Sequence, residues 1–320
     1  MRNPTRQRYR RQLLDWFDRH KRDLPWRRDR DPYRVWLSEV MLQQTRVAAV
    51  TDHYQRFLRR FPTLKKLASA RESSVLAAWS GLGYYRRARM LHAAAKRIVK
   101  EHGGEFPKRA AELRALPGIG RYTAAAIASI AFDEPVAVVD GNVERVLQRV
   151  QGRNLAGEGL WRAAEELLNR RRPGDFNQAM MELGATLCLP RQPQCRLCPV
   201  SDLCATRGEL QRAEKPSRQK KREMCYAFDC RDGSIFLVNR PKDARLMPCM
   251  WEFPEVATAN GTAAAWHTLR HSITATDYIV RVVQSPAPKS ADGRWVKKSR
   301  VATLPLTGLA RKILRAAKII

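Results

Sequence analysis

The chain has 320 residues, which is long enough for two domains and a sizeable core. Its 60 lysine and arginine residues outnumber 31 aspartate and glutamate residues, for a formal net charge of +29. Composition alone leaves simple solubility or adhesion to an anionic membrane surface open, but this excess favours nucleic acid, because cationic side chains bind phosphates. No apolar run reaches transmembrane length and none follows the basic N-terminus, so we expect neither a membrane protein nor a secreted precursor.

The first two-thirds of the chain repeats apolar residues at helical spacing and has no clear strand alternation. Asp31-Pro32 predicts one helix start, with Asp31 as the N-cap. Residues 116–123 (LPGIGRYT) join two helical segments, and Gly118 and Gly120 allow a tight turn there. The free N–H groups of the next helix would form a phosphate site, although a plain corner between helices uses the same glycines.

The composition changes after residue 204. Residues 205–222 mix lysine and arginine with glutamine, proline and serine, which predicts a basic linker. Three elements are predicted beyond it: a hairpin of residues 225–230 and 234–239 around Asp232-Gly233, a strand over 277–283 and a helix over 307–320. We therefore expect a mostly α-helical domain over residues 1–204 and a smaller α+β domain over residues 223–320.

Four of the seven cysteines crowd into one short loop, with the spacing C-x6-C-x2-C-x5-C: Cys188, Cys195, Cys198 and Cys204. This clustering favours a metal centre in a reducing compartment over a disulfide framework. We therefore expect a cytoplasmic protein, associated with the nucleoid of a cell that lacks a nucleus. Four thiolates alone do not distinguish structural zinc from an iron–sulfur cluster.

Two acidic residues stand out by their context. Glu39 lies in the segment LSEVMLQQT, residues 37–45, and Asp140 lies where a short apolar run meets a helix start. Taken alone, Glu39 is most simply a solvated carboxylate on a helix face, and Asp140 is most simply an N-cap.

Four segments together resemble the adenine DNA glycosylases of the MutY type, in the endonuclease III superfamily. They are SEVMLQQT (38–45), GLGYYRRAR (81–89), LPGIGRYTA (116–124) and VDGNVERV (139–146). The resemblance covers about residues 10–204 and implies a helix-hairpin-helix fold with a six-helix barrel module and an iron–sulfur module. In such a protein the loop 188–204 holds a 4Fe–4S cluster through its four cysteines. The implied partner is double-stranded DNA with adenine opposite 8-oxoguanine or guanine, bound by a monomer.

The same resemblance implies catalytic roles. Glu39, with a raised pKa in a closed site, would protonate a flipped adenine at N7 and later activate water. Asp140 would stabilise the oxocarbenium-like sugar, and Tyr122 and Asn142 would orient these groups. Bifunctional members carry a Schiff-base lysine at the position of Tyr122, so we expect base excision without an efficient lyase step.

Further DNA contacts are implied by the resemblance. Trp26, Arg27 and Gln178 would line the adenine site. Gln44 and Tyr84 would wedge into the base stack beside the lesion. Simpler explanations are a core position for Trp26, an ordinary polar helix residue for Gln178 and a buried structural tyrosine for Tyr84.

Residues 245–254 (RLMPCMWEFP) and 270–274 (RHSIT) resemble the Nudix-like C-terminal domain of these glycosylases, which recognises 8-oxoguanine. His271, Ser272 and Thr274 would contact the lesion. Three glutamates from residue 223 onward are too few for the Mg²⁺-binding helix of a Nudix hydrolase. The usual Phe-Ser-His is Ile273-Thr274-Ala275 here, so we expect a weaker or different preference for 8-oxoguanine over guanine.

Three other functions are compatible with parts of this pattern. A glycosylase for thymine or another mismatch would use the same scaffold, but such relatives generally lack the second domain. A non-catalytic lesion-binding protein would not need Glu39 and Asp140. A bifunctional endonuclease would need an amine where Tyr122 stands.

Overall fold

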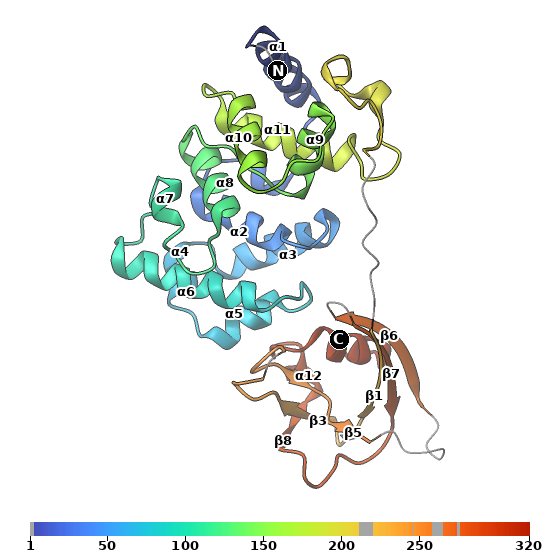
Figure 1. Ribbon diagram of the computed structural model, residues 1–320. Helices are drawn as coiled ribbons and strands as arrows, with labels where there is room; N and C mark the ends of the chain where they lie inside the picture. Colours follow the sequence, from blue (N-terminus) through green and yellow to red (C-terminus); the bar gives the residue numbers. More distant parts are fainter. Residues whose placement is uncertain (1–2, 211–219, 245, 258–264, 274–275) are drawn as a thin grey trace. The chain divides into compact units, whose positions relative to one another are not determined.

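The computed structural model describes residues 3–210, 220–244, 246–257, 265–273 and 276–320 (Figure 1). The chain forms two compact units: residues 1–68 with 93–213, and residues 69–92 with 214–320. A segment from the first third of the chain, residues 69–92, thus belongs to the same unit as the C-terminal part. The domain limits expected at residues 204 and 223 stay predictions.

Up to residue 210 the described chain is helical and has no strand, as the sequence pattern predicts. Its helices are α1 (Asn3–His20), η1 (Pro25–Arg27), α2 (Pro32–Leu42), α3 (Val47–Arg60), α4 (Leu64–Ala68), α5 (Glu72–Trp79), α6 (Arg86–Glu101), α7 (Ala110–Leu113), α8 (Arg121–Phe132), α9 (Gly141–Gln151), α10 (Gly157–Leu167), α11 (Pro173–Thr186), η2 (Cys195–Leu197) and η3 (Ser201–Leu203). None of the helices in the described ranges is long and apolar enough to cross a membrane.

Helices α2, α8, α9 and α11 pack together and carry the residues of the candidate site. Helix α2 begins as predicted: the Asp31 carboxylate accepts the Arg34 N–H at 3.0 Å, and Pro32 occupies the first turn. Helix α11 approaches α8 closely because Gly174 has no side chain; a Cβ there would lie 2.5 Å from the Ser129 carbonyl oxygen. These contacts fix four helices around one set of polar side chains.

The second unit contains two four-stranded sheets packed on one core with the C-terminal helix. Its elements after residue 214 are β1 (Lys220–Ala227), β2 (Cys230–Arg231), β3 (Ser234–Asn239), β4 (Trp251–Glu252), β5 (Glu255–Val256), β6 (His267–Ile273), β7 (Thr276–Val283), β8 (Gly293–Lys297), α12 (Lys298–Val301) and α13 (Gly308–Ala316). One sheet has the order β5-β1-β7-β6, with β1 and β7 parallel; in the other, β3 pairs with β2, β4 and β8. The strand predicted over 277–283 and the terminal helix are confirmed as β7 and α13.

The predicted hairpin forms around Asp232-Gly233, but its first arm is only the two residues of β2. The expectation that residues 225–230 form that arm is wrong, because β1 ends at Ala227 and pairs with β5 and β7 in the other sheet. Residues 225–228 are all buried. Such continuous burial is typical of a central strand covered on both faces, which is the position that β1 occupies.

Candidate active site

Glu39 lies on α2 with only 6% of its surface exposed, so it is not a solvated carboxylate. The Tyr122 hydroxyl, on α8, donates to Glu39 Oε2 at 2.5 Å and also lies 3.4 Å from the Met181 sulfur on α11. Burial raises the pKa of Glu39 to about 7; the Tyr122 hydrogen bond opposes this rise, and the nearby charge of Asp140 adds to it. Near neutral pH, Glu39 can therefore hold a proton and give it up.

Asp140 caps α9, which confirms the simpler explanation of this residue. Its Oδ1 accepts the backbone N–H groups of Asn142 at 2.9 Å and Val143 at 2.7 Å, and its Oδ2 accepts the Asn142 side-chain amide at 3.0 Å. Burial raises the pKa of Asp140 despite these hydrogen bonds, which lower it. Its charge also raises the pKa of both Glu39 and Tyr122, so the cap lies within the electrostatic reach of the Glu39 site.

Asn142 is held from two sides. A Cβ at Gly184 would lie 2.6 Å from the Asn142 Cβ, so glycine lets α11 meet the start of α9. Arg145 donates to Asn142 Oδ1 at 2.8 Å, to the Gly184 carbonyl at 2.7 Å and to the Cys188 carbonyl at 2.7 Å. Sequence reasoning missed Arg145, because two of its partners, the Gly184 and Cys188 carbonyls, are backbone atoms far away along the chain.

Arg27 is anchored by a buried carboxylate that sequence reasoning also missed. Glu182, on α11 and 1% exposed, accepts from Arg27 Nη2 at 2.8 Å and from Arg22 Nε at 2.6 Å. Burial opposes ionisation, but the two guanidinium groups outweigh it and lower the pKa of Glu182 to about 2. Glu182 lies four residues after the half-buried Gln178 on α11, so the two share a helix face, and this spacing could have identified Glu182.

Trp26 is buried, and its ring meets Tyr54 edge-on with a centroid distance of 5.4 Å. Its position agrees with the simpler explanation of a core residue. A core residue that borders a site can also contact a bound base. The proposed role of Trp26 in lining the adenine site therefore stays a prediction.

The two predicted wedge residues share an uncommon backbone conformation. Gln44 has φ +56° and Tyr84 has φ +46°, and both are exposed, Tyr84 by 49%. Tyr84 is therefore not a buried structural tyrosine. Left-handed backbone is costly for residues other than glycine and is concentrated at functional sites. Both side chains are thus held on the surface at a conformational cost.

The turn before α8 requires glycine at one position. Gly118 has φ +73°, whereas Gly120 has an ordinary φ of −83° and is the N-cap of α8. Nothing lies within 4 Å of where a Gly120 Cβ would be. Gly118 therefore shapes the turn, and the open space at Gly120 leaves room for a large partner near the start of the helix.

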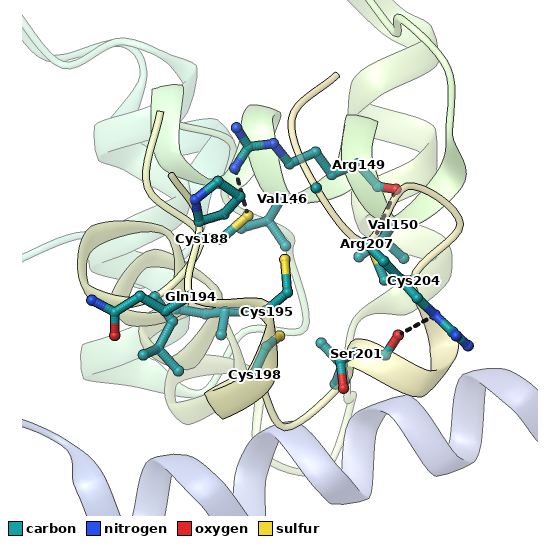
Figure 2. Close-up of a pocket in the computed structure, with 15 residues that line it drawn as sticks. Val146, Arg149, Val150, Cys188, Gln194, Cys195, Cys198, Ser201, Cys204 and Arg207 are labelled. Carbon is teal, nitrogen blue, oxygen red and sulfur yellow. Dashed lines mark hydrogen bonds between the residues drawn. The ribbon is translucent and has the colours of Figure 1, made fainter. Parts of the chain in front are cut away.

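Cys188, Cys195, Cys198 and Cys204 line one cavity together with Arg149 (Figure 2). Arg149 donates to the Cys188 sulfur at 3.3 Å and to the carbonyls of Leu189 at 2.6 Å and Pro190 at 2.9 Å. Burial raises the pKa of Cys198 to about 11, and the other three thiols add to the rise. Four thiols in one cavity are the donor set of a metal centre, which would bind them as thiolates and offset their negative charge.

In the second unit, His271 and Ser272 lie on β6. The Ser272 hydroxyl donates to Asp277 Oδ1 at 2.5 Å. Burial lowers the pKa of the half-buried His271, and Lys312 lowers it further. Thr274 and Ala275, and the linker residues 211–219, lie outside the described residues.

The chain is similar to known DNA repair proteins. The model of the family "HhH-GPD superfamily base excision DNA repair protein" matches residues 37–169. A mouse adenine DNA glycosylase is 43% identical over 312 residues, covering 78% of this chain and 60% of the mouse protein. A human adenine DNA glycosylase is 50% identical over 221 residues, covering 64% of this chain and 40% of the human protein. The chain thus spans only about half the length of these relatives.

Solved structures show the same fold. A thermostable thymine-DNA glycosylase is 32% identical, with a TM-score of 0.60, and the match covers 63% of this chain and 96% of that protein. An endonuclease III trapped with DNA has a TM-score of 0.56 at 24% identity, and the match covers 65% of this chain. These matches confirm the predicted helical fold, which a smaller sheet-containing part follows.

Proposed function

The chain belongs to the HhH-GPD superfamily of base excision DNA repair proteins, and from this premise we propose that it is a monofunctional adenine DNA glycosylase. Its substrate is double-stranded DNA in which adenine faces 8-oxoguanine or guanine, and it acts as a monomer. Residues 1–204 hold the catalytic site, a linker precedes β1, which begins at Lys220 and not after residue 222, and the C-terminal part recognises the opposite base. The names of the curated relatives support adenine as the excised base.

The observation that carries this proposal is the buried Glu39 with a pKa of about 7, hydrogen-bonded to Tyr122. Adenine is a poor leaving group until its ring is protonated, and an acid works best when its pKa lies near the working pH. A solvated carboxylate would be ionised at that pH and could not supply the proton. Burial therefore turns an ordinary glutamate into a general acid for adenine N7.

Asp140 takes the second role. Departure of adenine leaves positive charge on the sugar, and a carboxylate held by three hydrogen bonds can stabilise that charge without reorganising. Asn142 and Arg145 keep the carboxylate in place. Tyr122 orients Glu39, and a phenol cannot form an imine with the sugar, so strand cleavage does not follow base release efficiently.

The target adenine reaches this site by flipping out of the duplex. The exposed side chains of Gln44 and Tyr84 fill the stack where the base has left. The turn at Gly118 and the N-terminus of α8 bind a phosphate, and the net charge of +29 supports the binding of a polyanion.

Cys188, Cys195, Cys198 and Cys204 would hold a 4Fe–4S cluster. All four thiols line one cavity, and four cysteines are the donor set that such a cluster would take. When bound, such a cluster supplies an electron-transfer centre and cross-links the loop.

Replacing one cluster cysteine is expected to remove the cluster. Cys198→Ala should abolish the visible absorption and bound iron of the purified protein and lower its thermal stability by several degrees, since the loop loses its cross-link. Cys249→Ala is the matched control outside the loop and should retain both signals. Full iron content in Cys198→Ala, measured by a colorimetric iron assay, would contradict the assignment.

Adenine excision is tested with four duplex oligonucleotides under single-turnover conditions, each treated with alkali afterwards. They carry A opposite 8-oxoguanine, A opposite G, A opposite T and T opposite G. We expect strand breaks for the first, fewer for the second and none for A opposite T. Breaks without alkali would contradict the monofunctional mechanism, and no adenine release from any duplex would refute the proposed function.

The similarity to a thymine-DNA glycosylase, which the chain covers almost completely, makes thymine the second candidate base. The duplex with T opposite G decides between them. Release of thymine there, with adenine left intact in the other duplexes, would replace the proposed substrate.

A further inference from the structure

The turn that presents Tyr84 is unusually constrained. Three of its residues have left-handed backbone: Gly81 with φ +107°, Gly83 with φ +71° and Tyr84 with φ +46°. The Trp79 indole donates to the Gly83 carbonyl at 3.2 Å, and Arg87 donates to the Leu82 carbonyl at 3.2 Å. Glycine adopts this backbone freely, but at Tyr84 it is costly, and such a residue persists only when its surroundings fix it.

Arg87 also supports the exposed ring itself. Its guanidinium group lies 5.5 Å from the Trp79 ring centroid and 5.4 Å from the Tyr84 ring centroid. Burial lowers the pKa of Arg87 to about 10. The Arg87 guanidinium therefore contacts both the buried Trp79 indole and the exposed Tyr84 phenol. The direction of the Tyr84 ring thus depends on how the turn is anchored.

The anchor of this turn is a single backbone carbonyl in the C-terminal part of the chain. Both the Ser80 and the Tyr85 hydroxyl groups donate to the Leu306 carbonyl oxygen, each at 2.9 Å. All three residues are buried and belong to the same compact unit. A carbonyl oxygen has two lone pairs, so these two hydroxyl groups satisfy it completely.

Leu306 lies between Trp251 of β4, with which it forms a β-bridge, and the start of helix α13. Trp251 lies beside it, donating its N–H to the Pro305 carbonyl at 2.8 Å and accepting from the Thr307 N–H at 3.0 Å. Helix α13 starts two residues later, and the His271 ring lies 3.9 Å from where a Gly308 Cβ would be. His271 belongs to the strand that leads into the proposed lesion-contacting segment. The path from the tyrosine turn to that strand thus runs through Leu306, Thr307 and Gly308.

We propose that Ser80 and Tyr85 are positioning residues that couple recognition of the opposite base to insertion of Tyr84. The coupling element is the Leu306 carbonyl, which holds the tyrosine turn in the same compact unit as the β6 strand. A lesion bound beside β6 then fixes where the Tyr84 ring enters the base stack. This inference rests on the proposed function for the nature of the DNA, but its geometry does not involve Glu39 or Asp140.

The test uses 2-aminopurine in place of the target adenine, because its fluorescence rises when the base leaves the stack. The full-length protein is compared with Tyr85→Phe, Ser80→Ala and the double variant on duplexes with 8-oxoguanine or guanine opposite the probe. Tyr33→Phe is the matched control, since its buried hydroxyl donates to the Phe61 carbonyl at 2.7 Å in the other unit. Thermal unfolding of each variant accounts for lost stability.

The wild-type protein should give a larger fluorescence rise opposite 8-oxoguanine than opposite guanine. Each single variant should reduce that ratio by about fivefold, the worth of about one lost hydrogen bond, and the double variant should reduce it further. Tyr33→Phe should lose similar stability and keep the ratio. An unchanged ratio in the double variant would overturn the coupling, as would a wild-type protein without any preference. Base extrusion with this ratio but without adenine release would refute the proposed function and leave the coupling intact.

Discussion

Glu39→Gln is expected to lower the single-turnover rate of adenine release by about a thousandfold, within the range that general acid catalysis contributes. Glutamine is isosteric with the protonated acid and can still accept the Tyr122 hydroxyl that now lies 2.5 Å from Glu39 Oε2. It has no proton to give to adenine N7. The binding affinity for the duplex should therefore stay near that of the wild type, so a loss of rate with affinity retained isolates the chemical step.

The pH dependence of the wild-type rate should follow the ionisation of Glu39. The pKa of Glu39 lies near 7, above its ordinary value of 4.5, so the acid is protonated below pH 7 and ionised above it. We expect the rate to fall about tenfold per pH unit above that value, as expected for one essential proton. In Glu39→Gln this fall should be absent from the residual rate.

Protein stability provides an independent measure of the buried acid. Between pH 4.5 and about 7 the folded protein binds more protons at Glu39 than the unfolded chain does, so wild-type stability decreases as pH rises through this window. In Glu39→Gln no carboxyl group titrates at this position, so the variant does not lose this stability as pH rises. The melting temperature of the variant minus that of the wild type should therefore be larger at pH 8 than at pH 5, by a few degrees.

Glu101→Gln is the matched control, because Glu101 is exposed and pairs with Arg97 on the surface of α6. It should change neither the rate nor the pH profile. If Glu39→Gln released adenine at the wild-type rate, Glu39 would not be the acid. The protein would then be a lesion binder or would use another proton donor.

The sequence predicts the helical class and the identity of the two carboxylates, but it does not predict the burial that activates Glu39. Eight of the residues on α2 are buried, from Tyr33 to Met41, so this helix has no polar face that a periodicity could detect. A resemblance between short segments pointed to Glu39. Only the packing of α8 and α11 around it gives the physical reason for its pKa.

Long-range partners were the least predictable features. Glu182 binds Arg22 across 160 residues of chain and Arg27 across 155, and Arg145 reaches the Cys188 carbonyl. Such pairs form where helices pack against each other, and a single sequence does not show which helices do so. The attachment of residues 69–92 to the C-terminal unit arises in the same way, through hydroxyl donors whose acceptor is a backbone carbonyl.

Asp140→Asn should separate the structural role of this residue from its chemical one. Asparagine caps helices as well as aspartate does, so its side-chain oxygen can still accept the N–H groups of Asn142 and Val143. The free energy of unfolding should therefore fall less than in a variant without the cap, although the Asn142 side-chain amide loses its acceptor at Oδ2. The charge that faces the developing cation is lost, however, and the rate of adenine release should fall about a hundredfold or more.

Two further variants complete this comparison. Asp140→Ala removes both the cap and the charge, so it should lose the same activity and also about 1 kcal/mol of stability. Asp31→Asn makes the same chemical change at the N-cap of α2, where the carboxylate accepts the Arg34 N–H, and should leave the rate unchanged. A wild-type rate in Asp140→Asn would reduce Asp140 to a helix cap, because the geometry that remains would be sufficient without the charge. A loss of rate in Asp140→Asn, with a smaller loss of stability than in Asp140→Ala, would mean that one carboxylate both begins the helix and holds the cation.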